Sequence, residues 1–177
     1  MVAGPRTRQR ARLTGVGAYV PERVLTNADL EEMVDTTDEW IVSRTGIRER
    51  RIAADDQATT DLAVEAVRDL LRRTGTDPVD VDLLIVATTT PDYIFPPCAP
   101  TVATKTGMDH PAAVDINAVC SGFMYGIAQA TGMIESGMVR TAVVVGAETL
   151  SRIINWEDRA TCVLFADGSG AVLLEAD

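Results

Sequence analysis

The stretch AAVDINAVCSGFMYGIAQA, residues 112–130, decides the fold of this chain, because an apolar extended run gives way within it to a helix pattern. AAVDI predicts a strand. The helix pattern starts at Cys120 and ends at Gly137, and Gly122 and Gly126 allow close backbone packing one turn apart. One face of this helix has few charges to hold it in water, and it carries Phe123, Met124, Ile127, Ala130 and Ile134. We therefore expect the helix to be buried almost all round.

Cys120 stands where that helix is predicted to begin. The first amide N–H groups of a helix have no partner within it and its dipole is positive there, so a thiol at this place ionises more easily than in water. This position predicts a nucleophile at the floor of a pocket. A free cysteine is more often a small buried hydrophobic residue, and a central structural helix would show the same pattern. Both interpretations stay open on the local sequence.

Length, composition and charge limit the classes of function. The 177 residues are 46% hydrophobic and 24% charged, which is ordinary for a globular domain with one core. A net charge of −10 argues against sequence-independent binding to nucleic acid or to an anionic membrane. Cys98, Cys120 and Cys162 are an odd number without metal-type spacing, so they indicate neither a disulfide framework nor a zinc site. A reducing compartment fits, and we expect a cytoplasmic protein with no bound metal.

The amino-terminal residues 1–12, MVAGPRTRQRAR, are basic. They are not followed by the apolar core and cleavage site of a secretory signal. No run in the sequence approaches the length of a transmembrane helix. We expect residues 1–12 to form a disordered basic arm and residues 13–177 to form the domain.

Strand and helix patterns alternate along the rest of the chain. Besides AAVDI, strands are predicted at residues 13–20, 81–90 and 141–149, and residues 161–176 predict two strands in a hairpin at Asp167-Gly168. Helices are predicted at residues 28–34, after a capping box of Thr26 and Asp29, and at residues 38–46, 59–75 and 99–107. This order predicts a three-layer α/β domain with a mixed sheet between helical layers.

The sequence does not support two other functional assignments, a dinucleotide-binding loop and a catalytic histidine. Gly15 and Gly17 follow the start of a strand, but Val20 stands where a dinucleotide-binding fingerprint needs its third glycine. His110 is the only histidine and precedes Pro111 in a turn, which predicts a solvated residue. It lies ten residues before Cys120 across a predicted strand, so we do not expect it to be the general base.

Five stretches of the sequence resemble a known family in the family's own order. They are YVPERVLTNADLEEMVDTTDEWIVSRTGIRERRIA (19–53), ATTTPDYIFP (87–96), DINAVCSGF (115–123), VVVGAETLSR (143–152) and EDRATCVLFADGSGA (157–171). Together they resemble the β-ketoacyl-acyl carrier protein synthase III enzymes of the thiolase-like superfamily. The resemblance implies a thiolase-like α/β half-domain with a mixed five-stranded sheet between helical layers. It also implies that Cys120 is the acyl-accepting nucleophile.

The chemistry that the resemblance implies starts fatty-acid synthesis. An acyl-CoA acylates the cysteine, malonyl-acyl carrier protein is decarboxylated, and its carbanion attacks the thioester to give a β-ketoacyl-carrier protein. The backbone N–H of Cys120 would stabilise an oxyanion. The resemblance implies no cofactor beyond the coenzyme A thioester that serves as substrate, and no metal.

The resemblance assigns roles to further residues. Trp40 corresponds to the tryptophan that stacks on the adenine of coenzyme A, Arg159 to the arginine on the other side of that ring, and Arg44 to a contact near the nucleotide phosphates. Thr36 matches a polar residue at the same entrance, though it could equally cap a helix. On the residues alone, Trp40 could be a packing residue and the two arginines surface ion-pair partners.

The acyl pocket and the dimer are implied in the same way. Phe95 resembles the residue that crosses the homodimer interface to close the neighbour's acyl pocket, and Phe165 and Thr89 would line the pocket. Core packing would also explain Phe95, and it would explain Phe165 and Thr89 in their predicted strands.

The family's histidine and asparagine, which act on the malonyl thioester, have no match before the chain ends at Asp177. We therefore expect that the carboxy-terminal half-domain is absent, that the chain is inactive in condensation alone, and that the uncovered Cys120 helix promotes self-association. A starter-unit ketosynthase or acyltransferase of polyketide synthesis, and a non-catalytic partner subunit, remain alternatives.

Overall fold

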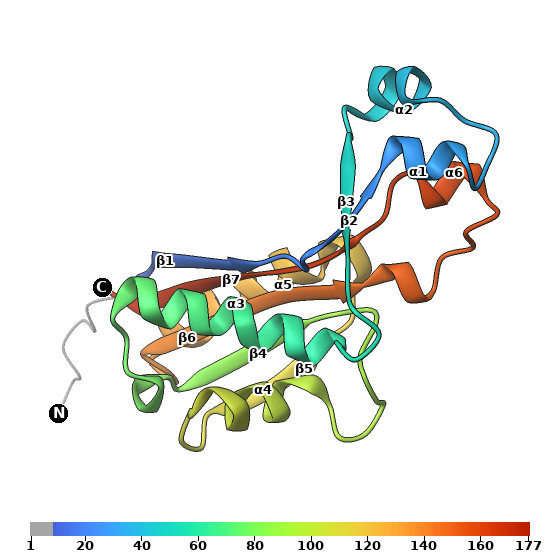
Figure 1. Ribbon diagram of the computed structural model, residues 1–177. Helices are drawn as coiled ribbons and strands as arrows, with labels where there is room; N and C mark the ends of the chain where they lie inside the picture. The colour runs from blue at the N-terminus through green and yellow to red at the C-terminus, as the bar shows by residue number, and fades with distance from the viewer. Residues whose placement is uncertain (1–8) are drawn as a thin grey trace, which may run out of the picture.

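Five strands form a mixed sheet in the order β1-β7-β6-β4-β5 (Figure 1). They are β1 (Ala11–Tyr19), β4 (Leu83–Ala87), β5 (Ala112–Ile116), β6 (Thr141–Thr149) and β7 (Asp167–Ala176). β4 is parallel to both β5 and β6, whereas β7 is antiparallel to both β6 and β1. This computed structural model describes residues 9–177. The predicted mixed five-stranded sheet is confirmed.

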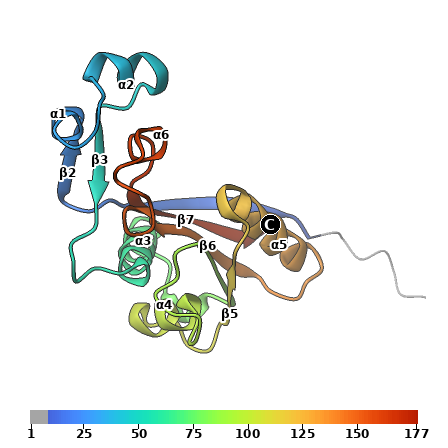
Figure 2. The ribbon, with the colours of Figure 1, turned by 90° about the vertical axis from the view of Figure 1, so that its right-hand side faces the viewer.

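Helices cover both faces of the sheet. On one face lie α3 (Thr59–Thr74) and α4 (Cys98–Thr106), and on the other lies α5 (Gly122–Glu135), as Figure 2 shows. Side chains alternate between the faces of a strand. In β4, Val86 packs with the α3 and α4 side chains and Ile85 packs with those of α5. Both are fully buried, as expected for a strand between two helical layers.

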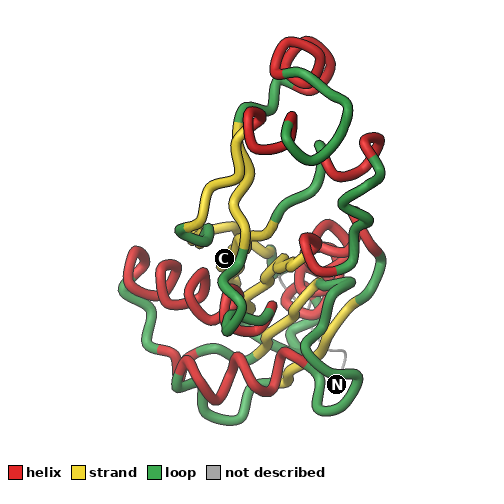
Figure 3. Tube along the Cα trace, turned by 45° about the vertical axis from the view of Figure 1, so that its right-hand side comes forward, coloured by secondary structure: helices red, strands yellow, loops and turns green. Residues whose placement is uncertain are grey.

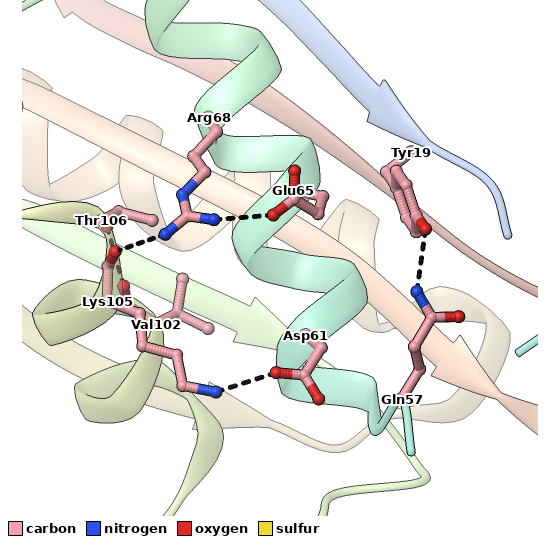
Figure 4. A network of polar contacts seen from close by, with 8 residues as sticks. All are labelled: Tyr19, Gln57, Asp61, Glu65, Arg68, Val102, Lys105 and Thr106. Carbon is pink, nitrogen blue, oxygen red and sulfur yellow. Dashed lines mark hydrogen bonds and ion pairs between the residues drawn. The ribbon is translucent and has the colours of Figure 1, made fainter. Parts of the chain in front are cut away.

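Polar contacts join α3 to α4, and the loop before α3 to β1 (Figure 4). The Nζ atom of Lys105 lies 2.8 Å from Oδ1 of Asp61, and Nη2 of Arg68 donates to the backbone oxygen of Lys105 at 3.1 Å. Nε2 of Gln57 donates to Oη of Tyr19 at 2.9 Å. An exposed ion pair contributes at most about 1 kcal/mol, so the buried apolar side chains between the helices, and not these contacts, provide most of the stability.

A small extension projects from the sheet (Figures 1 and 3). It consists of the antiparallel strands β2 (Arg23–Thr26) and β3 (Glu49–Ile52) with the helices α1 (Asn27–Glu31), α2 (Asp38–Thr45) and α6 (Arg159–Cys162). We call this unit the hairpin extension. It has its own buried cluster, formed by Leu25, Leu30, Ile41, Ile52, Cys162 and Val163. The sequence did not indicate β2 or β3, because four-residue strands rich in arginine lack a clear apolar alternation.

The helix boundaries follow the predicted caps. Thr26 and Asp29 form the predicted capping box of α1, although α1 ends at Glu31, before the predicted residue 34. Gly46, Gly75 and Gly107 end α2, α3 and α4 with φ angles of 73°, 70° and 80°. A positive φ is accessible to glycine without a steric penalty, which is why it ends helices.

The predicted hairpin at Asp167-Gly168 is wrong. Residues 159–162 form α6, and a single strand, β7, begins at Asp167. The buried carboxylate of Asp167 accepts hydrogen bonds from the backbone N–H groups of Ala53, at 2.7 Å, and of Ser151, at 2.9 Å. Asp167 therefore joins the sheet to the hairpin extension. The sequence predicts a turn between two strands at this residue.

Two residues that the sequence assigned to the amino-terminal arm belong to the sheet. Residues 1–8 lie outside the described residues. Ala11 and Arg12, which were assigned to the arm, pair with Ala176 and Glu175 as the first residues of β1. The strand thus starts two residues before the predicted residue 13.

Gly17 provides a test of the packing between β1 and α3. A Cβ atom on Gly17 would lie 2.4 Å from the backbone nitrogen of Leu70 and 2.5 Å from the backbone oxygen of Ala66. Backbone atoms inside a helix cannot move aside singly, so Gly17→Ala should lower the free energy of unfolding by about 3 kcal/mol. Urea denaturation measures this change.

Gly132→Ala is the matched control, because no atom lies within 4 Å of a Cβ built on this exposed glycine of α5. Alanine favours a helix over glycine by roughly 0.5–1 kcal/mol, so this variant should be at least as stable as the unmodified protein. Equal stability of the two variants would mean that β1 and α3 do not approach as closely as described.

Candidate active site around Cys120

Cys120 lies in a turn of 3₁₀ helix, Val119–Ser121, that connects β5 to α5. The side chain of Cys120 is exposed, and α5 itself begins two residues later, at Gly122. Val119 has a φ of 50°, which is a left-handed conformation that β-branched residues rarely adopt. Such strain persists only where the surroundings hold it, and it is common at active sites. The strained residue beside an exposed thiol makes this turn a candidate functional site.

Cys120 lines a cavity of about 520 Å³, which we call the Cys120 cavity. Thr89 and Phe165, the two predicted pocket residues, line the same cavity. Both are half-buried. The prediction that they lie in strands is wrong, because Thr89 follows β4 and Phe165 lies between α6 and β7. The remaining lining residues are Ala87, Val119, Phe123, Gly146, Ala147, Glu148, Leu150, Ile153, Ile154, Gly168, Ser169 and Gly170. The walls are largely apolar, which suits an acyl chain.

The helix after Cys120 is buried on one side only. A Cβ atom on Gly126 would lie 2.8 Å from Cγ1 of Val144, so this glycine lets α5 lie close against the sheet. The buried residues of α5 recur every fourth position, at Gly122, Gly126, Ala130 and Ile134. On the other side Met124 is 64% exposed and Tyr125 is 61% exposed. The prediction of a helix buried almost all round is therefore wrong for this chain, because its outer apolar face is open.

The two other thiols have a different environment. Cys98 belongs to the apolar cluster under α3 and α4, and Cys162 belongs to that of the hairpin extension. Burial raises the pKa of both Cys98 and Cys162 above the usual value of a thiol. Of the three cysteines, only Cys120 is exposed.

This difference predicts selective alkylation of the folded protein. Iodoacetamide at neutral pH should modify Cys120 at least about a hundredfold faster than Cys98 or Cys162, because the buried thiols react only after local opening and are rarely thiolates. Tryptic mass spectrometry with time gives the three rates. All three thiols should react alike in urea, and similar rates in the folded protein would contradict the structure.

Trp40 and two arginines lie together on the hairpin extension. The Cζ atom of Arg44 lies 4.5 Å from the centroid of the Trp40 ring, and that of Arg159 lies 4.9 Å from it. Trp40 and Arg44 are on α2, whereas Arg159 begins α6, and its Nη1 donates to the backbone oxygen of Asp35 at 2.9 Å. The structure thus brings Arg159, which is distant in sequence, to Trp40 and Arg44 on α2, in a stack of a flat ring and planar cations.

Thr36 lies before α2, and it is not the helix cap. The hydroxyl group of Thr37 accepts the hydrogen bond from the backbone N–H of Trp40, at 3.1 Å. The hydroxyl oxygen of Thr36 is buried and has no hydrogen-bond partner among the described residues. The alternative interpretation of Thr36 as a cap is therefore wrong.

Arg50 supports this region, and sequence reasoning missed it. Its guanidinium is buried, and it donates to Oδ1 of Asn27 and, from Nε at 3.1 Å, to the backbone oxygen of Val163. Asn27 in turn donates through Nδ2 to Oδ1 of Asp38 at 2.7 Å and to the oxygen of Ile47 at 2.9 Å. Arg50 therefore links the start of α2 to the end of α6, the two helices that carry Trp40 and Arg159.

Phe95 and His110 lie away from the Cys120 cavity. Phe95 is 86% exposed in the loop before α4 and is not among the residues that line the cavity, so the interpretation of Phe95 as a core anchor is wrong. The side chain of His110 is 96% exposed before the first residue of β5, whereas Cys120 follows the last. The prediction of a solvated turn histidine at the far end of the strand is confirmed.

Residues 9–177 contain no group of three or more His, Cys, Asp or Glu side chains placed to hold a metal ion. Within the same residues, no helix has the length and apolarity needed to cross a bilayer.

Comparisons with known proteins agree on one family. The profile of the family described as 3-oxoacyl-[acyl-carrier-protein (ACP)] synthase III matches residues 114–177. Beta-ketoacyl-[acyl-carrier-protein] synthase III 2 of Halalkalibacterium halodurans is 55% identical over 168 residues, which cover 95% of this chain and 51% of that protein.

Solved structures give the same result. The 3-oxoacyl-[acyl-carrier-protein] synthase III of Aquifex aeolicus VF5 superposes with a TM-score of 0.90 and 47% identity, over 93% of this chain and 53% of that one. The priming beta-ketosynthase of the R1128 polyketide biosynthetic pathway superposes with a TM-score of 0.92 and 37% identity, over 99% of this chain and 53% of that one.

The chain spans about half the length of the curated relatives it matches. The predicted thiolase-like fold is confirmed by the superpositions, and the family that the five sequence stretches resemble is the one that the comparisons find. Over about half of their length, this chain is similar to proteins named β-ketoacyl-[acyl-carrier-protein] synthase III, and the model of that family matches its residues 114–177.

Proposed function

We propose that this protein is a β-ketoacyl-acyl carrier protein synthase III that accepts an acyl group from acyl-CoA on Cys120. The observation that carries the proposal is the exposed thiol of Cys120 on a strained turn at the wall of a largely apolar cavity. The Sγ atom attacks the thioester carbon, the bond from that carbon to the sulfur of coenzyme A breaks, and coenzyme A leaves as the free thiol with the proton of Cys120. The acyl chain then occupies the Cys120 cavity between Thr89 and Phe165.

The second half-reaction completes the proposed condensation. Malonyl-acyl carrier protein loses carbon dioxide, and its carbanion attacks the acyl-cysteine thioester. The bond from the acyl carbon to Sγ breaks, the β-ketoacyl-carrier protein is released, and the thiolate of Cys120 takes a proton from solvent. The backbone N–H of Cys120 serves as one oxyanion donor in both steps. The histidine and asparagine of the family have no counterpart among these 177 residues, so for the condensation step we assign to this chain only the acylated Cys120 and its backbone N–H.

Coenzyme A is proposed to bind on the hairpin extension. Its adenine would lie between Trp40 and Arg159, its phosphates near Arg44, and Thr36 at the entrance. The present stack of both guanidinium groups on the Trp40 ring supports this assignment, because such planar groups also bind purines and phosphates. In this conformation Arg159 occupies one face of the ring, so adenine must displace it to enter.

Trp40→Ala tests the coenzyme A site. The loss of one aromatic stacking surface is worth about 1–3 kcal/mol for a base, so the Kd for coenzyme A should rise roughly tenfold or more. Isothermal titration calorimetry measures the change. Tyr93→Ala removes an aromatic ring that is 69% exposed in another loop, and it should leave the Kd unchanged. A normal Kd for the Trp40 variant would exclude this adenine site.

The remaining partners follow from the same proposal. We propose a homodimer in which Phe95 of one chain closes the acyl pocket of the other, and its exposure in this chain supports that role. We also propose a cytoplasmic enzyme that uses the acyl carrier protein as acceptor.

Mass spectrometry tests the main proposal directly. The full chain is incubated with acetyl-coenzyme A, and the peptides are then examined for an added acetyl group. The adduct should be found on Cys120 and should disappear after treatment with hydroxylamine, which cleaves thioesters. An adduct confined to another side chain would refute the proposed nucleophile.

A second candidate function is the priming step of polyketide synthesis. Its support is the superposition on a priming ketosynthase over 99% of this chain. The two functions differ in the starter unit, so competition between acetyl-CoA and longer or branched acyl-CoA thioesters for Cys120 separates them.

A further inference from the structure

Glu148 is a charged residue in the wall of the otherwise largely apolar Cys120 cavity. It lies near the end of β6 and is half-buried. Its carboxylate accepts hydrogen bonds from the backbone N–H of Thr89, at 2.8 Å, and from the hydroxyl groups of Thr88, at 3.3 Å, and Thr90. A carboxylate in such a place has a desolvation penalty, which these three donors offset. The carboxylate therefore organises the three threonines that follow β4.

These threonines are held on their buried side as well. The hydroxyl of Thr90 accepts a hydrogen bond from the backbone N–H of Thr149 at 2.9 Å, and the hydroxyl of Thr59 donates to the backbone oxygen of Thr90 at 2.6 Å. Thr88 and Thr90 are buried, whereas Thr89 between them faces the cavity. The ends of β4 and β6 are thus fixed relative to each other at the cavity wall.

From Thr89 the contacts continue to the turn that carries the nucleophile. The hydroxyl of Thr89 donates to Oδ1 of Asn117 at 2.9 Å, and the backbone N–H of Val119 donates to the same oxygen at 3.4 Å. Asn117 directly follows β5, and Val119 is the residue with the left-handed backbone next to Cys120. The contacts therefore run from Glu148 through Thr89 and Asn117 to the strained residue beside the thiol.

We propose that Glu148 is a positioning residue for Cys120, acting through Thr89 and Asn117. A left-handed valine is unfavourable by about 1–3 kcal/mol, and hydrogen bonds to its turn offset that strain. The inference rests on the proposed role of Cys120 as acyl acceptor. It adds that the carboxylate sets the geometry of acyl transfer without touching the reacting atoms.

Glu148→Gln is the main test, because it preserves shape and removes the charge and one acceptor oxygen. In the full chain, acetyl transfer from acetyl-coenzyme A to Cys120 should slow about tenfold, since acyl transfer requires aligned attack and an aligned oxyanion donor. Alkylation of Cys120 by iodoacetamide, which needs no such alignment, should change less than twofold. The amide proton of Thr89 should also exchange faster with solvent, since it loses its charged acceptor.

Asp82→Asn is the matched control. Asp82 is a carboxylate at the other end of β6, where Oδ2 accepts from the backbone N–H groups of Arg140, at 2.7 Å, and Thr141, at 3.0 Å. Asp82→Asn should reduce thermal stability about as much as Glu148→Gln does, and it should leave the rate of acetyl transfer to Cys120 unchanged. If Glu148→Gln does not fold, Asn117→Ala is the alternative test. Asn117 is exposed, so its replacement should not disturb the core, and the substitution removes the oxygen that connects Thr89 to Val119.

The outcomes are distinct. Slower acetyl transfer in Glu148→Gln or Asn117→Ala, with normal alkylation and a normal Asp82→Asn, supports the proposal. Normal transfer in the Glu148 and Asn117 variants, or an equal loss in Asp82→Asn, overturns it while leaving Cys120 as the acceptor. If the unmodified protein forms no adduct on Cys120, the proposed function fails, and the positioning role fails with it.

Discussion

Cys120→Ala is expected to lower acyl transfer from acyl-CoA to the protein by at least about a thousandfold, because the variant lacks the only atom that can carry the acyl group. The side chain is exposed and makes no buried contact that the fold requires, so the free energy of unfolding should change by less than about 0.5 kcal/mol. Transfer is measured with radiolabelled acetyl-coenzyme A and stability by urea denaturation.

Cys98→Ala is the matched control for this loss. Cys98 is 2% exposed in the apolar cluster beneath α3 and α4, so its replacement should reduce stability by about 1 kcal/mol and preserve transfer. Cys120→Ala should therefore lose acyl transfer and keep its stability, whereas Cys98→Ala should keep acyl transfer and lose stability. Retained biological activity in Cys120→Ala would instead favour a non-catalytic partner subunit, which needs its surface and not its thiol.

The central α/β layers could be predicted because their residues repeat a simple pattern. β4 and β6 are apolar on both sides, which is characteristic of strands between two helical layers, and α3 has one apolar face and a glycine after its last residue. The hairpin extension could not be predicted in this way. Its strands are short, and Arg50 is buried between the exposed Glu49 and the half-buried Arg51, which composition alone does not indicate.

The candidate site shows the same division. Cys120 could be identified from its place between a strand and a helix, whereas its cavity depends on contacts that are distant in sequence. Glu148 and Thr89 are 59 residues apart, yet the backbone N–H of Thr89 donates a hydrogen bond to the carboxylate of Glu148. The predicted hairpin at Asp167 is wrong for a similar reason, since its partners Ala53 and Ser151 make it a link between units where its local sequence indicates a turn.

Arg50→Met is expected to reduce the free energy of unfolding by about 3 kcal/mol. Methionine retains the apolar part of the side chain, but it leaves the backbone oxygen of Val163 and Oδ1 of Asn27 without a donor in a buried place. A buried acceptor that loses its partner is destabilising by about 1–3 kcal/mol. For a chain of this length the change corresponds to a fall in Tm of roughly 6–12 °C, which thermal denaturation measures.

Arg51→Met is the control for Arg50→Met, and coenzyme A binding is a second measurement on the Arg50 variant. Arg51 is the next residue of β3, its side chain is 37% exposed, and its ion pair with Glu49 is 3.4 Å long. Its Nη1 also donates to the backbone oxygen of Pro21 at 3.2 Å, so Arg51→Met should lower the free energy of unfolding by about 1 kcal/mol, clearly less than Arg50→Met. Because Arg50 joins the helices that carry Trp40 and Arg159, Arg50→Met should also weaken coenzyme A binding at temperatures where the variant is folded. Equal stabilities of the two variants would mean that the buried guanidinium does not join α2 to α6.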